Sequence, residues 1–130
     1  MRLLLDTHIA LWAILDDARL PKSAADLIAD PGNTVSVIAV SVWEISIKHG
    51  LDRLIDMPVS GPQALAFFRA AGYEMLAIST EHAAAVQSLP DLHRDLCDRL
   101  IVAQALTEPL ILLTSDAVVA EYSSTGIRLV

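Results

Sequence analysis

A three-layer α/β/α sandwich with a mostly parallel central sheet is the fold class that the sequence predicts. Short apolar or β-branched runs alternate with segments of helical periodicity along the whole chain, as they do in βαβ units. Residues 110–114 are nearly all apolar, which is typical of a strand covered on both faces. The length of 130 residues suits one domain, spanning 1–130, and leaves no room for a second core.

Five segments have the character of strands. Residues 2–6 form an apolar run that Asp6 and Thr7 end abruptly. Residues 34–38 are rich in β-branched side chains and alternate along the chain. In order, the predicted strands cover residues 2–6, 34–38, 73–78, 110–114 and 127–130.

Seven helices are expected around these strands. Thr7 is expected to cap a helix that begins near His8, because apolar residues then recur at helical spacing. Pro21 suits the start of the second helix, and Gly50 suits the end of the third. In order, the predicted helices cover residues 8–15, 22–29, 40–49, 61–72, 80–88 with Thr80 as its cap, 96–106 and 116–122.

The composition excludes several classes of protein. Hydrophobic residues make up 54% of the chain and charged residues 19%, which indicates a substantial core and not a disordered chain. The chain has no apolar run of about 18 residues, as a membrane span requires, and the N-terminal run is too short for a signal peptide. Cys97 is the single cysteine, so a cytoplasmic location is expected. The mean hydropathy of +0.50 predicts apolar surface for self-association or a partner.

The net charge of −7 argues against indiscriminate nucleic-acid binding, which normally needs a basic face. It does not argue against a nuclease, because several acids could form a metal site whose charge divalent cations would neutralise.

Asp6 and Asp116 each follow a predicted strand, and ligands of open α/β sheets bind beyond the carboxyl ends of strands. Both residues could instead cap the next helix, although Thr7 and Ser115 compete for that role. Glu44 is expected on or beside a buried helix face, where a lone carboxylate is costly unless it is paired or binds a cation. Its alternative role is an ion pair with Lys48 at i+4.

Asp95 and Asp98 are three residues apart at the start of a predicted helix, so they project from the same face. Asp95 suits a helix cap, whereas Asp98 opens a nearly unbroken apolar helix and is expected to be half-buried. Carboxylates from separate segments suit Mg²⁺ or Mn²⁺, which prefer oxygen ligands. The four histidines lack a recognisable ligand spacing; they are His8, His49, His82 and His93.

Four segments together resemble the PIN-domain family, in particular the VapC-type toxins of toxin–antitoxin pairs. The resemblance covers nearly the whole chain, and its two helical motifs are the specific ones. Where such toxins often have Asp-Pro-Phe-Asp, this chain has Asp95-Leu96-Cys97-Asp98. The segments are Leu3-Leu4-Leu5-Asp6-Thr7-His8 with Leu11-Trp12, Ser41–Lys48, His93–Ala105, and Leu113-Thr114-Ser115-Asp116.

The resemblance implies a metal-dependent endoribonuclease in which Asp6, Glu44, Asp98 and Asp116 hold Mg²⁺ or Mn²⁺ and activate water. It also implies a homodimer and a cognate antitoxin. Residues expected near the same pocket are Asp95, Thr7, Thr114 and Ser115, and those expected to contact RNA phosphates are Lys48, Arg94 and Arg99, unless they are solvated surface.

Three alternatives remain open. A non-catalytic binding module could share the fold, and a DNase could share the chemistry. A Mg²⁺-dependent phosphoryl-transfer domain is disfavoured because it usually needs a late lysine, and no lysine follows Lys48.

Trp12 and Trp43 are expected in the core, with an interface role as the alternative.

Overall fold

A five-stranded sheet forms the centre of the computed structural model, which describes residues 1–51, 57–90, 95–122 and 127–130. The strand order is β3-β2-β1-β4-β5, and each neighbouring pair is parallel. The predicted α/β sandwich is confirmed, with a sheet that is parallel throughout the described residues. The strands are β1 (Arg2–Leu5), β2 (Thr34–Ile38), β3 (Glu74–Leu76), β4 (Ile111–Thr114) and β5 (Ile127–Leu129).

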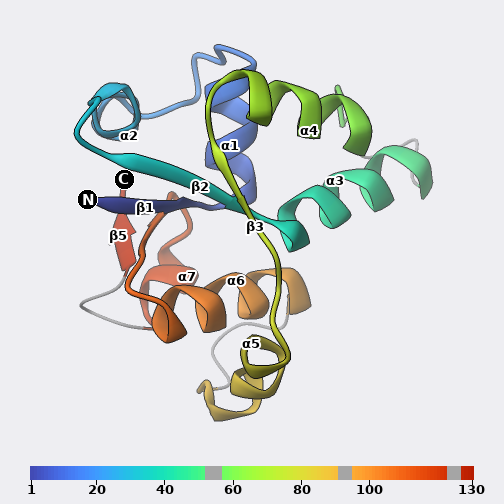
Figure 1. Ribbon diagram of the computed structural model, residues 1–130, viewed down its shortest axis with the longest axis vertical. Helices are drawn as coiled ribbons and strands as arrows, with labels where there is room; N and C mark the ends of the chain where they lie inside the picture. The colour runs from blue at the N-terminus through green and yellow to red at the C-terminus, as the bar shows by residue number, and fades with distance from the viewer. Residues whose placement is uncertain (52–56, 91–94, 123–126) are drawn as a thin grey trace.

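Helices cover both faces of the sheet (Figure 1). One layer contains α1, α2 and α4, and the other contains α6 and α7, while α3 extends from the end of β2. The helices are α1 (Thr7–Ile14), α2 (Lys22–Ala29), α3 (Ala39–Leu51), α4 (Gly61–Ala70), α5 (Thr80–Ala85), α6 (Leu96–Thr107) and α7 (Ala117–Ala120), and a short 3₁₀ turn covers Val86–Ser88. No described helix is both long enough and apolar enough to cross a bilayer.

The leucines of β1 show how the two cores form. Successive strand residues point to opposite faces, so Leu3 and Leu5 join the cluster under α1 and α2, and Leu4 joins the cluster under α6. All three side chains are fully buried. The sheet therefore needs an apolar run in β1 where a surface sheet would have an alternating one.

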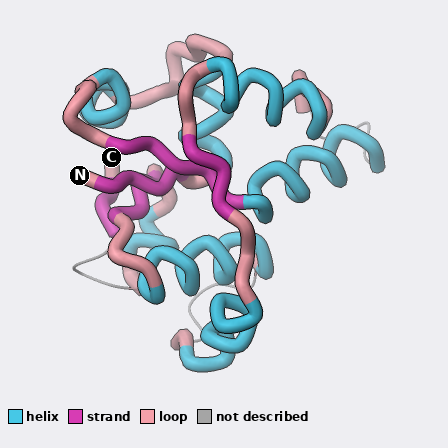
Figure 2. The backbone as a smooth tube through the Cα atoms, viewed as in Figure 1, coloured by secondary structure: helices cyan, strands magenta, loops and turns pink. Residues whose placement is uncertain are grey.

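The order of the strands creates a switch point between β1 and β4. The chain builds outward from β1 through β2 to β3, and then returns to the other side of β1 to place β4 and β5 (Figure 2). In doubly wound sheets the crevice beyond the strand ends at such a point is where ligands bind. Asp6 and Asp116 follow the two strands that meet there.

Two expected caps were wrong, because neighbouring side chains compete for the same backbone N–H groups. Asp6, not Thr7, caps α1. Ser79 replaces Thr80 as the cap of α5, since it forms a reciprocal capping box with His82. The cap considered for Asp116 is present, since Asp116 and not the competing Ser115 caps α7, which is shorter than expected.

The end of α3 also differs from the prediction. The helix continues through Gly50 to Leu51, and Gly50 does not adopt a positive φ. Gly72 does, with φ of 83°, and it follows the end of α4. β3 is shorter than the predicted segment, and only its residues Glu74–Leu76 pair with β2.

The two tryptophans lie in different environments. Trp12 is partly buried and packs against the core, whereas Trp43 is 53% exposed on α3, so its expected place in the core was wrong. The reason is the position of α3, which projects from the sheet and leaves one side of the helix uncovered (Figure 1).

Gly61 is required by close packing at the start of α4. A Cβ atom at this position would lie 1.7 Å from Ser46 Oγ and 2.9 Å from Ser46 Cβ, both on α3. Gly61→Ala is therefore expected to lower the free energy of unfolding by about 1–3 kcal/mol, as overpacking does. Urea unfolding measures the change.

Gly50→Ala is the matched control, because nothing lies within 4 Å of a Cβ added there. Within a helix this exchange is expected to raise stability by up to about 1 kcal/mol. Equal effects of the two substitutions would show that the contact with Ser46 does not restrict the α3–α4 packing.

Candidate metal centre

Asp6 lies where β1 ends and is only 5% exposed. Its Oδ1 accepts a hydrogen bond of 2.7 Å from the Thr7 amide, and its Oδ2 accepts one of 2.7 Å from Thr114 Oγ1. Since Thr114 ends β4, this carboxylate joins the two strands of the switch point.

Burial raises the pKa of Asp6 above its usual value. The hydrogen bonds from Thr114 and Thr7 act in the opposite direction and favour the ionised form, as does the nearby His8. The negative charge of Glu44 adds a smaller increase, so the two carboxylates are close enough to repel each other. A cation between them would relieve this repulsion.

Thr114 also positions Asp116. Its Oγ1 accepts a 3.0 Å hydrogen bond from the Asp116 amide while it donates to Asp6. The Asp116 carboxylate caps α7, accepting from the amides of Val118 at 2.8 Å and Val119 at 3.4 Å. Ser115 is exposed between Thr114 and Asp116. Asp116 therefore has the capping role that was considered as its alternative, and it lies at the same edge of the sheet as Asp6.

Glu44 is the second buried carboxylate, at 6% exposure on α3. The ion pair considered as its alternative role exists, since Lys48 Nζ lies 2.7 Å from Glu44 Oε2. The other oxygen, Oε1, is buried and has no hydrogen-bond partner among the described residues. Leaving a buried acceptor unpaired costs about 1–3 kcal/mol, so the lysine alone does not account for this side chain.

A hydrogen bond between two hydroxyl groups sets the position of Glu44 relative to Asp6. Thr7 Oγ1 donates to Ser41 Oγ at 2.9 Å, and both residues are buried. Ser41 lies three residues before Glu44, on the same side of α3. The bond thus fixes the first turn of α1 against the first turn of α3. The sequence offered one signal for Ser41, a small polar residue within an apolar helix.

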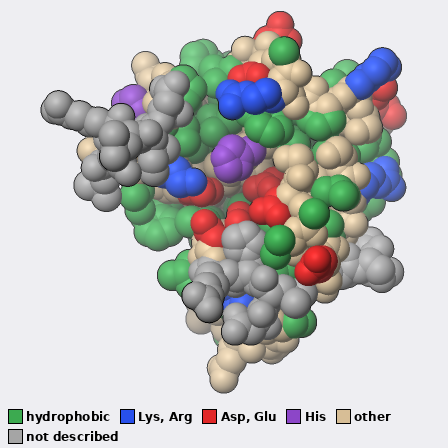
Figure 3. Space-filling model, turned by 180° about the vertical axis from the view of Figure 1, so that it is seen from behind, with side chains coloured by type: hydrophobic (Ala, Val, Ile, Leu, Met, Phe, Trp, Pro, Cys, Tyr) green, Lys and Arg blue, Asp and Glu red, His purple; other side chains and the backbone are tan. Residues whose placement is uncertain are grey.

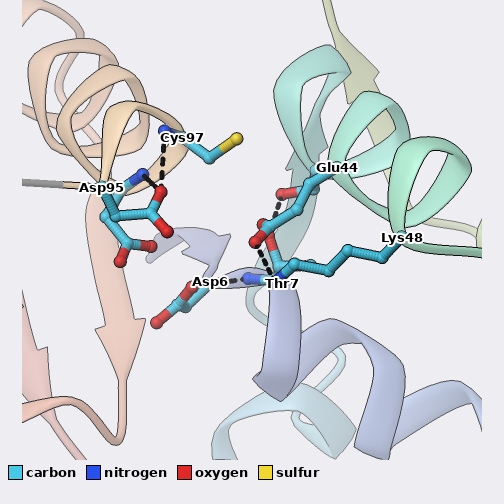
Figure 4. Close-up of polar contacts among 8 residues, drawn as sticks. Asp6, Thr7, Glu44, Lys48, Asp95 and Cys97 are labelled. Atoms are coloured by element: carbon cyan, nitrogen blue, oxygen red, sulfur yellow. Dashed lines mark hydrogen bonds and ion pairs between the residues drawn. The ribbon is translucent and has the colours of Figure 1, made fainter. Parts of the chain in front are cut away.

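The start of α6 contributes a further acid and a thiol (Figure 4). Asp95 caps this helix, with Oδ1 accepting from the amides of Cys97 at 2.9 Å and Asp98 at 3.2 Å. Ligand atoms of Glu44, Asp95 and Cys97 lie within 4.8 Å of one another. Among the described residues, Asp6, Asp98 and Asp116 do not belong to that compact group.

The pKa of the Cys97 thiol responds to its burial and to the negative charge around it. Burial raises the pKa of Cys97 to about 11, and the carboxylates of Glu44, Asp95 and Asp98 contribute. Burial alone would lower the pKa of Lys48, but the hydrogen bond and charge of Glu44 outweigh it, so the pKa of Lys48 is raised. Figure 3 shows Asp and Glu side chains gathered beside a histidine on one face, with Lys and Arg side chains around them.

The three basic residues expected to contact RNA differ in what the structure describes. Lys48 pairs with Glu44. Arg99 donates to the carbonyl oxygens of Pro90 at 3.3 Å and Val86 at 3.2 Å. Arg94 lies outside the described residues. Their contacts with phosphate groups stay a prediction.

The donor set fits a hard divalent cation. Asp6 and Glu44 are buried and repel each other, Glu44 has an orphaned oxygen, and further carboxylates stand at Asp95, Asp98 and Asp116. Carboxylate oxygens are the ligands that Mg²⁺ and Mn²⁺ prefer.

Comparison with known proteins agrees with this fold. Three solved structures share it, each with 20% sequence identity: VapBC2 of Rickettsia felis bound to a promoter DNA fragment, a toxin–antitoxin complex from Klebsiella pneumoniae, and VapBC-5 from Mycobacterium tuberculosis. Their TM-scores are 0.62, 0.60 and 0.60, and the likeness covers 89%, 97% and 99% of this chain and 88%, 95% and 97% of the matched chains. No curated protein matches.

The family model of the PIN domain matches residues 3–124, from β1 to beyond α7. This span includes every carboxylate described above, and the chain belongs to the PIN domain family.

Proposed function

We propose that this chain is a metal-dependent endoribonuclease, a single-domain toxin of a toxin–antitoxin pair that acts in the cytoplasm. The observation that carries the proposal is the pair of buried carboxylates, Asp6 and Glu44, at the switch point of the sheet. Burying two acids that repel each other is costly without a cation. Such a cost is typical of sites kept for function.

Asp6, Glu44, Asp98 and Asp116 would hold Mg²⁺ or Mn²⁺, with Asp95 beside them. A bound ion of this kind lowers the pKa of a coordinated water and neutralises charge on a phosphodiester. The chain's own contribution is orientation. Thr114 holds Asp6 in place through its 2.7 Å hydrogen bond, which favours the ionised form, and Lys48 holds Glu44 through its 2.7 Å contact.

RNA is the proposed substrate because of the chain's resemblance to the toxin group within its family. With a net charge of −7, the chain would bind RNA through few cations, so affinity should depend on Lys48, Arg94 and Arg99. Lys48 faces the acidic pocket, so its positive charge would lie beside the proposed point of cleavage.

A cognate antitoxin is proposed as the partner, and a homodimer as the assembly. The three similar structures are described as VapBC or toxin–antitoxin complexes. Apolar surface for such contacts exists, since Trp43 is 53% and Phe67 46% exposed. An apolar groove of about 250 Å³ lies nearby, lined by Ala39, Val42, Leu65, Met75, Leu76 and Ala77.

Cleavage of a mixed RNA pool tests the proposal. We expect purified protein to cut RNA with Mg²⁺ or Mn²⁺, to lose this activity with EDTA, and to lose it in Asp98→Asn. Asp26→Asn is the matched control, because Asp26 is exposed on α2 and pairs with the exposed Lys22. Circular dichroism establishes that both variants are folded.

Other outcomes exclude the proposal. Cleavage of DNA but not RNA would make the chain a DNase. Retention of a phosphoryl group would indicate phosphoryl transfer instead. An intact mass that shows no bound partner, together with no cleavage of any nucleic acid, would make it a non-catalytic binding module.

A further inference from the structure

The thiol of Cys97 lies in a position that a purely hard-ion site does not require. Cys97 is in the first turn of α6, and its side chain projects into the space between α6 and α3 (Figure 4). There its sulfur and carboxylate oxygens of Glu44 and Asp95 are within 4.8 Å of one another. The three donors therefore come together from two helices that are far apart in sequence.

Glu44, which the proposed Mg²⁺ or Mn²⁺ site shares, also points to a bound cation. The residue is 6% exposed, Lys48 engages only its Oε2, and the buried Oε1 has no partner among the described residues. Buried carboxylate oxygens in folded proteins are normally hydrogen-bonded or bound to a cation. A cation reached by the thiol and by Asp95 would satisfy this oxygen.

The mixed donor set determines the kind of cation. Zinc takes sulfur at about 2.3 Å and carboxylate oxygen at about 2.0–2.2 Å, and its tetrahedral geometry places two such donors about 3.5–3.7 Å apart. The ligand atoms of this group lie within 4.8 Å of one another, so side-chain movements of about 1 Å would bring them to that separation. Thiolate ligands select zinc and other thiophilic ions, whereas Mg²⁺ and Mn²⁺ favour oxygen alone.

The surroundings of Cys97 favour the binding of a divalent cation and leave it a path from solvent. Glu44, Asp95 and Asp98 act on Cys97 as negative charges, and the ammonium of Lys48 opposes them among the described residues. Asp95 is exposed, so an ion can arrive from solvent on its side. Two backbone N–H groups hold Asp95 Oδ1 over the first turn of α6, which keeps the carboxylate beside the thiol.

We propose that Glu44, Asp95 and Cys97 form a binding site for a thiophilic divalent cation such as Zn²⁺. Binding forms a metal–sulfur bond, and the thiol proton leaves to solvent. The site shares Glu44 with the carboxylates proposed to hold Mg²⁺ or Mn²⁺. Its consequence, which rests on the proposed function, is that zinc competes for Glu44 and inhibits RNA cleavage.

Cobalt titration of the reduced full-length protein tests the site directly. Co²⁺ replaces Zn²⁺ in such sites, and a cobalt–thiolate bond absorbs in the near ultraviolet. Because Cys97 is the single cysteine, any such band reports this residue. We expect the band to saturate at one Co²⁺ per chain, to disappear when Zn²⁺ is added, and to persist in a large excess of Mg²⁺.

Variants separate this site from its neighbours. Cys97→Ser is expected to remove the band, and Asp95→Asn to weaken cobalt binding at least about tenfold, since even outer-shell partners have effects of that size. Asp6→Asn and the surface variant Asp26→Asn are expected to keep it. In the cleavage assay, Cys97→Ser should raise the zinc concentration for half-inhibition at least about tenfold, the same factor as the lost ligand costs in affinity.

Three results would overturn the inference: no band in folded wild-type protein, a band that survives Cys97→Ser, or saturation at one Co²⁺ per two chains, which would indicate a thiolate bridge between copies. The proposed function fails separately. A cobalt band without RNA cleavage would contradict the proposed nuclease and support the zinc site. Metal-dependent cleavage without a band would support the nuclease and contradict the zinc site.

Discussion

Replacing Asp6 by asparagine is expected to abolish RNA cleavage and yet leave the metal-free protein at least as stable as the wild type at neutral pH. The loss of activity should be about 10³-fold or more, because the lost ligand removes several kcal/mol of charge stabilisation, at about 1.4 kcal/mol per tenfold. The gain in stability follows from the burial of Asp6, which disfavours its charge.

The sign of the pH dependence follows from the direction of the shift. The pKa of Asp6 is raised in the folded protein above the ordinary 3.8. A raised acid pKa means that the folded state holds its proton more tightly, so this group stabilises most at low pH. That contribution is lost as the pH rises from 3.8 through the folded pKa. The asparagine side chain of the Asp6→Asn variant does not titrate, so the variant lacks this dependence.

The amide can occupy the same position without breaking the local network. The side-chain oxygen of asparagine still accepts from the Thr7 amide, which preserves the cap of α1. The amide nitrogen can donate to Thr114 Oγ1, whose hydroxyl hydrogen is free to rotate. The repulsion between the side chain at this position and Glu44 also disappears.

Urea unfolding of the metal-free protein from below pH 3.8 up to neutral pH measures this difference, with Asp26→Asn as the exposed control. The wild type should lose stability relative to Asp6→Asn as the pH rises. A variant that is less stable than the wild type by more than about 1 kcal/mol across this range would show that the two hydrogen bonds to Asp6 outweigh its desolvation.

The strands and helices could be predicted from the sequence because their periodicity is strong. The three buried leucines of β1 and the apolar run of β4 identify the centre of the sheet without any tertiary information. The exact ends of helices were harder to predict, because Asp6 and Thr7, or Ser79 and Thr80, are adjacent candidates for one cap, and Asp and Ser are only moderately better caps than Thr.

The contacts between distant segments could not be predicted from the sequence. It indicated that Glu44 is buried, but not that one of its oxygens has no partner among the described residues. It placed Asp95 beside the site as an auxiliary acid, but it did not indicate that Cys97 lies with Asp95 and Glu44. Such proximity depends on how α3 and α6 pack, and no local pattern encodes the packing of two helices that lie far apart in the sequence.

A divalent cation is expected to stabilise the protein, and Glu44 is expected to be required for the effect. At a concentration about one hundred times its dissociation constant, Mn²⁺ should add about 2.7 kcal/mol to the free energy of unfolding. For a domain of this size, that corresponds to a rise in melting temperature of about 8–13 °C. Glu44→Gln removes an anionic oxygen, and we expect it to lose most of this rise.

Glu81→Gln is the matched control, because Glu81 is exposed in the first turn of α5. It should keep the full response to Mn²⁺. Thermal melts in EDTA and in a Mn²⁺ series provide the comparison. If Glu44→Gln responds like the wild type, the ion is held without Glu44.

Substituting Lys48 tests the role of Glu44 more directly. The Lys48 ammonium contacts Glu44 Oε2, while Oε1 has no partner among the described residues. Lys48→Met should cost the metal-free protein about 1–3 kcal/mol, since it removes the hydrogen bond of a buried carboxylate. The same substitution should strengthen Mn²⁺ binding, because the ion then competes with no ammonium for the two oxygens of Glu44.

In the double variant with Glu44→Gln, the cost of Lys48→Met should largely disappear, because no buried charge remains unpaired at this position. Urea unfolding of the wild type, the two single variants and the double variant in EDTA measures the coupling between the two residues. A cost that stays the same in the double variant would mean that Lys48 stabilises the fold through other contacts, and that its bond to Glu44 is not what keeps this carboxylate in place for the metal.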